Sequence, residues 1–201
     1  MKQLLLTILF LLIATFYSHA QAPSTSLTDE QWTPLYQALE TEDWATAEKL
    51  ASKYLDEVKP EADNNTLGRL RFMYLFSAAG RIGAGKMSYD DLQKRIGEMA
   101  GKEIVFPGRY LKANCRGGVD FNALCKSDGP HDIMVTSTGR DATTIFSFEY
   151  IKLKEKLDWT KTDGKVASIS GTIESIAPNP NKSRLLIMRI YITDGRVRLK
   201  D

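Results

Sequence analysis

Two cysteines are the residues of this chain best suited to a defined chemistry. Cys115 and Cys125 are its only cysteines, and nine residues separate them. A redox-active pair is more often separated by two residues, and a metal site requires further ligands close by. We therefore predict a structural disulfide between them, which requires that the chain reach an oxidising compartment. We predict no metal site and no bound cofactor.

Histidine chemistry after residue 20 depends on one ring, that of His131. A two-histidine metal site cannot form from it, and any catalytic triad would have to use it. It follows Asp128-Gly129-Pro130, a turn sequence, which favours a position at the surface or at the edge of a strand. We predict no catalytic residue here and keep His131 as a possible ligand-binding residue.

Two catalytic patterns are set aside on their spacing. Residues 80–86 read G-x-x-x-x-G-K, but Met87 stands where a phosphate-binding loop needs Ser or Thr, and the preceding residues have helical spacing. We therefore predict no nucleotide ligand. Acidic residues such as Glu149 and Glu155 are assigned to polar faces or turns, and no two of them stand out as a glycosidase pair.

Basic and aromatic residues in the second half of the chain are the remaining candidates for binding. Phe146, Phe148 and Tyr150 alternate along one predicted strand and could stack on bases or sugars if they were exposed. We favour a core position for them, because a small sheet needs one apolar face. The residues that we single out for possible ligand binding are His131, Arg184, Arg189, Tyr191, Arg196 and Arg198.

The N-terminus predicts export. Lys2 precedes an apolar run over residues 4–17, and Ser18-His19-Ala20 follows it. The run is too short for the ~30 Å hydrocarbon core of a bilayer and has the organisation of a cleavable signal peptide. We predict removal of residues 1–20, no transmembrane span in the mature chain, and a location in the periplasm, the cell envelope or the medium of a bacterium.

Residues 21–101 have the spacing of helices. Thr28 and Gln31 form a capping box for a first helix, although Pro34 leaves a later start at Thr33 as an alternative. Ser88, with Asp91 three residues later, is the predicted N-cap of the last helix. We expect four helices, and three of them have one apolar stripe, formed by Trp32, Leu35, Tyr36 and Leu39; by Trp44, Ala47, Ala51, Tyr54, Leu55 and Val58; and by Tyr89, Leu92, Ile96 and Met99. The third helix in chain order, over about residues 65–80, is apolar nearly all round, as a central and buried helix would be, through Leu70, Phe72, Met73, Tyr74, Leu75 and Phe76.

One segment of this region resembles a tetratricopeptide (TPR) repeat. The residues that carry the resemblance are Asp43, Trp44, Ala47, Ala51, Tyr54 and Pro60. With the helices on either side, the segment is similar to about two such hairpins. The resemblance implies antiparallel helical hairpins that bind peptides or other proteins, or that pack against a neighbouring domain.

From residue 102 to residue 201 the period changes from helical to two. We predict strands over residues 131–136, 143–153, 167–174, 186–193 and 196–199, with a hairpin turn at Asp194-Gly195 and a bulge after Tyr150. The short strands resemble a small antiparallel barrel of the OB (oligonucleotide and oligosaccharide binding) type, and an open sheet or sandwich is the alternative. The predicted fold class is therefore α+β.

Charge singles out no class of partner for the whole chain, whose formal net charge is +2. Acidic residues outnumber basic ones in residues 21–101, and the reverse holds in residues 102–201. We predict an exported, non-enzymatic binding or scaffolding protein with a protein partner in the envelope. One alternative is the binding of a glycan or another anionic ligand by the β domain, and another is a hydrolase with a site at the domain junction.

Overall fold

A computed structural model describes residues 26–59, 64–115, 120–121 and 123–200 of the chain. The predicted signal peptide, residues 1–20, lies outside the described residues. The described chain is α+β, as predicted. Helices occupy it as far as Met99 and strands begin at Glu103, close to residue 102, where the period of the sequence changes.

The helical part contains α2 (Asp29–Glu40), α3 (Trp44–Glu57), α4 (Asn64–Gly83) and α5 (Tyr89–Ile96), followed by the short 3₁₀ helix η1 (Gly97–Met99). The capping box of Thr28 and Gln31 is present, so the first helix begins there. The later start at Thr33 is wrong, because Pro34 is accommodated inside α2. Ser88 caps α5 as expected, its side chain accepting a hydrogen bond from the Asp91 amide.

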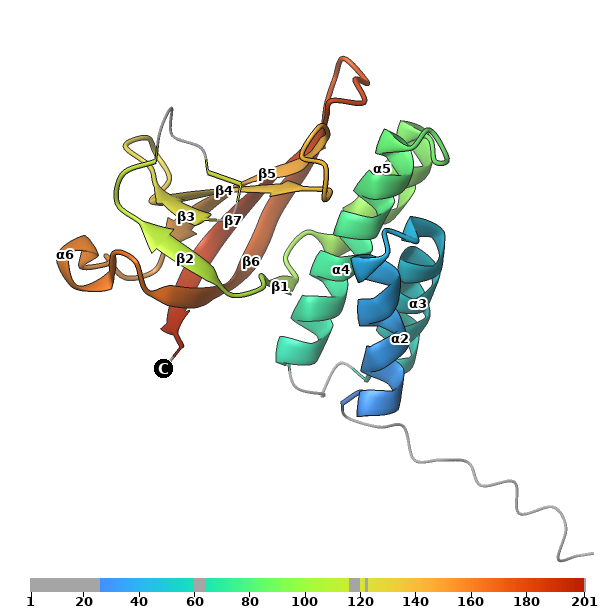
Figure 1. The fold of residues 1–201 in the computed structure, drawn as a ribbon, viewed down its shortest axis with the longest axis horizontal. Helices are drawn as coiled ribbons and strands as arrows, with labels where there is room; N and C mark the ends of the chain where they lie inside the picture. Colours follow the sequence, from blue (N-terminus) through green and yellow to red (C-terminus); the bar gives the residue numbers. More distant parts are fainter. Residues whose placement is uncertain (1–25, 60–63, 116–119, 122, 201) are drawn as a thin grey trace, which may run out of the picture.

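α4 is the central helix, lying between the α2–α3 pair and the sheet (Figure 1). The Trp44 ring of α3 contacts Phe76 of α4 edge to face at 5.5 Å and Phe146 of the sheet at 5.3 Å. A Cβ atom at Gly80 would lie 2.4 Å from the Trp44 ring, so glycine is required for this approach. Helices and sheet therefore share one aromatic cluster.

Among the described residues the sheet has seven strands in the order β1-β6-β2-β3-β4-β5-β7, and β6 pairs in addition with β7. The strands are β1 (Glu103–Val105), β2 (Arg109–Lys112), β3 (Ala123–Lys126), β4 (Ile133–Thr138), β5 (Ile145–Leu153), β6 (Val166–Pro178) and β7 (Leu186–Leu199). A four-residue helix, α6 (Trp159–Thr162), precedes β6.

The predicted small antiparallel barrel is wrong, and the alternative of a sheet describes the chain. The β2–β3 and β5–β7 pairs are parallel, which a meander of consecutive hairpins cannot produce. The three short strands β1, β2 and β3 were not among the predicted ones. They carry too few residues for a recognisable alternation, since each has three or four.

The predicted hairpin turn at Asp194-Gly195 is also wrong. β7 runs through both residues and remains paired with β6, with a shift of register opposite them. Asp194 has a φ of 52°, and a Cβ atom at Gly195 would lie 3.0 Å from the Lys152 carbonyl oxygen. The sequence that would favour a tight turn therefore forms a bulge within one long strand.

Within the described ranges, no helix combines the length and the hydropathy that a membrane crossing needs. The resemblance of the helical part to TPR hairpins stays a prediction, which the geometry of α2, α3 and α4 alone does not test.

Candidate functional site

A groove lies between the helices and the sheet, where α2 and α4 face β1, β6 and the end of β7. Its volume is about 920 Å³, within the range of ligand-binding clefts. The helix wall carries Tyr36, Leu39, Phe72, Met73 and Phe76, and the floor carries Val105, Phe106, Pro107 and Ile169. Because most of these side chains are apolar, the groove offers an apolar surface to whatever enters it.

Cations surround this apolar surface. The basic residues that line the groove are Arg69, Arg109, Arg196, Arg198 and Lys200. Glu103 is the one carboxylate among the described lining residues, and its Oε1 lies 4.0 Å from the Arg196 guanidinium. The groove therefore carries an excess of positive charge, which favours anionic ligands.

Three of the cations form a row along β7. Arg196 and Arg198 alternate with Val197, and they lie opposite Ser170 and Ser168 of β6 in the register. The Lys200 amide donates to the Val166 carbonyl at 2.9 Å, so the ladder continues one residue past the end of β7. Alternate residues of a strand share a face, and the three side chains therefore follow one another along the same edge of the groove.

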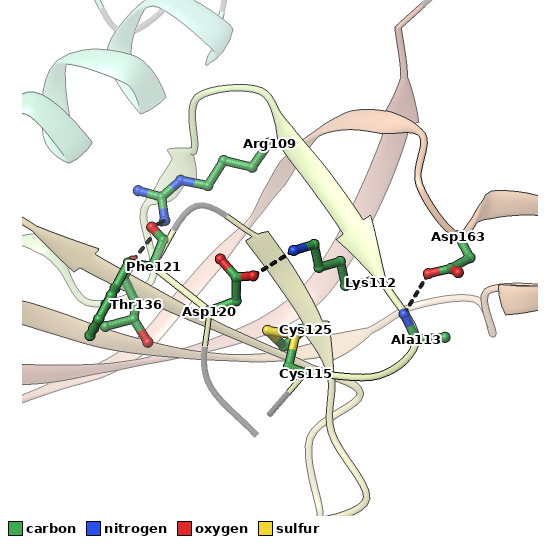
Figure 2. Close-up of a disulfide and its surroundings, with 9 residues drawn as sticks. All are labelled: Arg109, Lys112, Ala113, Cys115, Asp120, Phe121, Cys125, Thr136 and Asp163. Atoms are coloured by element: carbon green, nitrogen blue, oxygen red, sulfur yellow. Dashed lines mark hydrogen bonds and ion pairs between the residues drawn. A yellow bond between two sulfur atoms is a disulfide. The ribbon is translucent and has the colours of Figure 1, made fainter. Parts of the chain in front are cut away.

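Arg109 lines the groove, and its guanidinium group is hydrogen-bonded to residues of β4. Its Nη1 donates to the Thr136 carbonyl at 2.8 Å and to the Phe121 carbonyl at 3.4 Å, and its Nη2 donates to Ser137 Oγ at 3.1 Å. Figure 2 shows its guanidinium turned toward Phe121 and Thr136. Burial lowers the pKa of Arg109, and the nearby carboxylate of Glu149 opposes that decrease.

Glu149 is fully buried in the sheet, with an exposed fraction of 0 %. Its Oε1 accepts a hydrogen bond from the Ser147 hydroxyl, whereas its Oε2 has no hydrogen-bond partner among the described residues. Burial raises the pKa of Glu149 to about 7, and the positive charge of Arg109 limits the rise. The carboxyl group therefore changes its protonation state near neutral pH.

The position of Glu149 is the largest departure from the sequence prediction, which assigned this residue to a solvated polar face. Ser147, Glu149 and Ile151 alternate along β5, and all three are buried. Glu149 lies opposite Val135 of β4, which is buried as well. The alternation of Glu149 with Ile151 was the available signal, but the alternating aromatic residues Phe146, Phe148 and Tyr150 indicated the opposite face as the core.

The carboxyl groups near the junction bear on the predicted alternative of a hydrolase. Glycoside hydrolysis uses two carboxyl groups about 5–10 Å apart, and Glu103 alone lines the groove within the described residues. Glu149 has no exposed surface and does not line the groove. In the part of the chain that the structure describes, no group of three His, Cys, Asp or Glu side chains is placed to hold a metal ion.

The aromatic residues of β5 are divided between two environments. Phe146 is buried against Trp44 and Phe76, as the core interpretation requires. Phe148 and Tyr150 are only half-buried, so a core position is wrong for them. Phe146, Phe148 and Tyr150 alternate along β5 and share one face of it. The helices contact this face at Phe146, and we call its part around Phe148 and Tyr150 the outer face.

Two of the predicted binding residues meet Tyr150 on that outer face. Tyr191 stacks on Tyr150 with ring centroids 5.2 Å apart and planes at 14°, and His131 lies 5.5 Å from Tyr150 and 5.8 Å from Tyr191. Arg189, two residues before Tyr191, lies opposite Phe148 in the register. The tyrosine rings partly cover each other's faces, which leaves less ring surface for stacking on a sugar.

Arg184 lies away from both of these places. It belongs to the loop between β6 and β7, where its guanidinium lies close to Gly85, in the turn after α4. The Tyr89 hydroxyl of α5 contacts the end of the same loop, where its one proton is shared between the Ser183 carbonyl at 2.6 Å and the carbonyl of Leu186, the first residue of β7, at 3.1 Å. The six predicted binding residues therefore fall into three separate groups, and Arg196 and Arg198 alone line the groove.

The predicted disulfide between Cys115 and Cys125 is present. Cys125 lies in β3, and the bond closes the loop that joins β2 to this parallel neighbour (Figure 2). Lys112 and Asp120 form an ion pair at 2.5 Å across the same loop, and the Ala113 amide donates to Asp163 at 2.7 Å. These contacts stabilise the chain at the C-terminal end of β2, the end opposite Arg109.

Comparison with protein-family models, with curated proteins and with solved structures found no significant match to this chain.

Proposed function

We propose that the protein is a non-enzymatic binding protein whose groove between α2, α4 and the sheet takes an anionic ligand. The observation that carries the proposal is the row of Arg196, Arg198 and Lys200 beside an apolar wall. Such a row spans about 14 Å at about 3.4 Å per residue, which is too long for a single carboxylate or phosphate. It suits a ligand with several negative charges along its length.

The side chains that line the groove support ligand binding rather than catalysis. Aromatic and aliphatic side chains supply contact area, and the basic residues supply orientation and a faster encounter with an anionic partner. Arg196 keeps 64 % of its side-chain surface exposed, so its charge is available to a ligand. The Glu103 carboxylate lies at the limit of an ion pair with it and is readily displaced.

Export belongs to the same proposal. Paired cysteines are common in oxidising compartments and rare in the cytosol, so the disulfide between Cys115 and Cys125 supports delivery of the chain across a membrane. The intact mass of the protein recovered from the producing cell should equal that of residues 21–201 less two hydrogen atoms. A full-length mass with two free thiols would contradict export.

Fluorescence anisotropy with labelled poly-L-glutamate tests the groove. We expect binding that weakens as the salt concentration rises, because exposed charges are screened. Replacing Arg69, Arg196 and Arg198 together by alanine should weaken binding by about tenfold or more, at a few tenths to about 1 kcal/mol for each exposed ion pair.

A matched control removes the same number of charges elsewhere. Lys152, Lys154 and Arg184 are exposed and do not line the groove. Alanine at these three positions should leave the affinity for poly-L-glutamate within about twofold of the original value. Equal losses in the two triple variants would show that net charge, and not the groove, determines binding.

A further inference from the structure

We propose that the ligand of the groove is an extended peptide segment in which acidic residues alternate with apolar ones. The inference rests on the proposed function and specifies its ligand. Two features of the groove carry it, the spacing of the cations along β7 and the different chemistry of the two walls.

The spacing of the cations matches that of an extended chain. Arg196, Arg198 and Lys200 are held in a straight row because β7 pairs with β6 on this side, at Ser170 and Ser168 and through the Lys200 amide. Side chains on one face of a strand repeat every ~6.8 Å. A peptide in extended conformation has the same repeat, so carboxylates at its positions i, i+2 and i+4 would meet the three cations in register.

The walls of the groove differ in a way that requires the alternation. The β7 wall is basic, whereas the helix wall opposite carries one cation, Arg69, and is otherwise lined chiefly by Phe72, Met73 and neighbouring apolar side chains. Successive side chains of an extended peptide point to opposite sides. When its acidic residues face β7, the residues between them face α4, where apolar side chains would be buried.

Packing keeps the helix wall in place. Phe72 of α4 contacts Phe106 at 5.4 Å edge to face and stacks on Phe76 at 5.6 Å. The Arg71 guanidinium donates to the Glu103 carbonyl at 2.6 Å and so fastens β1 to the same helix. The two walls are therefore held at a fixed separation, and a peptide that enters the groove meets a preformed surface.

Two labelled peptides of identical composition test the inference by fluorescence anisotropy with the intact protein. One has the core Glu-Leu-Glu-Leu-Glu, and the other has the core Glu-Glu-Glu-Leu-Leu. We expect the alternating peptide to bind about tenfold more tightly, because the contiguous one places neighbouring carboxylates on opposite sides. Arg198→Ala should weaken binding of the alternating peptide by about threefold, whereas Arg184→Ala should leave it unchanged.

Each contrary result identifies what has failed. Equal affinity for the two peptides would overturn the inference about alternation and leave binding of anionic ligands by the groove intact. A labelled oligothymidylate that binds more tightly than both peptides would overturn it in favour of a phosphodiester ligand. Binding of neither peptide, together with no binding of poly-L-glutamate, would overturn the proposed function as well.

Discussion

Replacing Glu149 by glutamine should remove a dependence of folding stability on pH. The pKa of Glu149 is about 7 in the folded chain, against an ordinary value of 4.5. The folded state therefore binds a proton more tightly than the unfolded state does. Stability contributed by this group is fully present below pH 4.5 and is lost as the pH rises toward 7, because the buried carboxyl group must then ionise.

The size of the effect follows from the two pKa values. A difference of one pH unit corresponds to about 1.36 kcal/mol, so the complete loss is about 3 kcal/mol. Between pH 5 and pH 8 the free energy of unfolding should fall by about 2.5 kcal/mol more in the original protein than in Glu149→Gln, since glutamine does not titrate. Arg109 is charged throughout this range and is common to both proteins.

Urea unfolding at pH 5, 6, 7 and 8, followed by tryptophan fluorescence, measures this difference. Glu155→Gln is the matched control, because Glu155 is an exposed carboxylate of the same β domain, and it should reproduce the original pH profile. Parallel profiles for Glu149→Gln and the original protein would refute the reasoning, since they would mean that burial of this carboxyl group does not affect its ionisation.

Three further changes probe the packing. Cys115→Ser with Cys125→Ser should lower the free energy of unfolding by about 2–3 kcal/mol, and reductant should lower the melting temperature of the original protein but not that of the double variant. Gly80→Ala should lower the free energy of unfolding by about 1–3 kcal/mol, because the added Cβ atom would overlap the Trp44 ring. Gly97→Ala adds a Cβ atom with no other atom within 4 Å and should not lower the melting temperature. Tyr89→Phe removes the hydroxyl that donates to the carbonyl groups of Ser183, in the β6–β7 loop, and Leu186, the first residue of β7, and it should increase amide hydrogen exchange in the loop; unchanged exchange would show that the hydroxyl does not hold the loop.

The sequence predicted the elements whose signals are local. The capping box of Thr28 and Gln31 and the cap at Ser88 involve residues within one turn, and both helices begin where expected. The disulfide between Cys115 and Cys125 was predicted because two cysteines allow a single pairing. Such features depend little on how distant parts of the chain are arranged.

The sheet was harder to predict because strand order is decided by contacts between distant segments. Asp194-Gly195 has the composition of a hairpin turn, but β6 pairs with β7 on both sides of it and keeps it within one strand. Tertiary pairing therefore overrode a local turn preference. Parallel pairing of β5 with β7 likewise has no signature in the sequence of either strand.

The groove could be predicted only in part. Arg196 and Arg198 were singled out for their charge, and both line it. Arg69 and Phe72 belong to a helix whose apolar residues were all assigned to packing, and Lys200 follows the last predicted strand. Nothing in a single sequence indicates that Arg69 and Phe72 lie across the groove from Arg196, because that depends on where α4 lies on the sheet.

Mapping of amide chemical shifts by NMR, during titration with the Glu-Leu-Glu-Leu-Glu peptide, locates the ligand directly. We predict that the largest changes fall on residues 196–199 of β7 and on Lys200, on residues 168–170 of β6 and on residues 69–76 of α4. Changes concentrated instead around His131, Tyr150 and Tyr191 would place the ligand on the outer face of the sheet and would contradict a function for the groove.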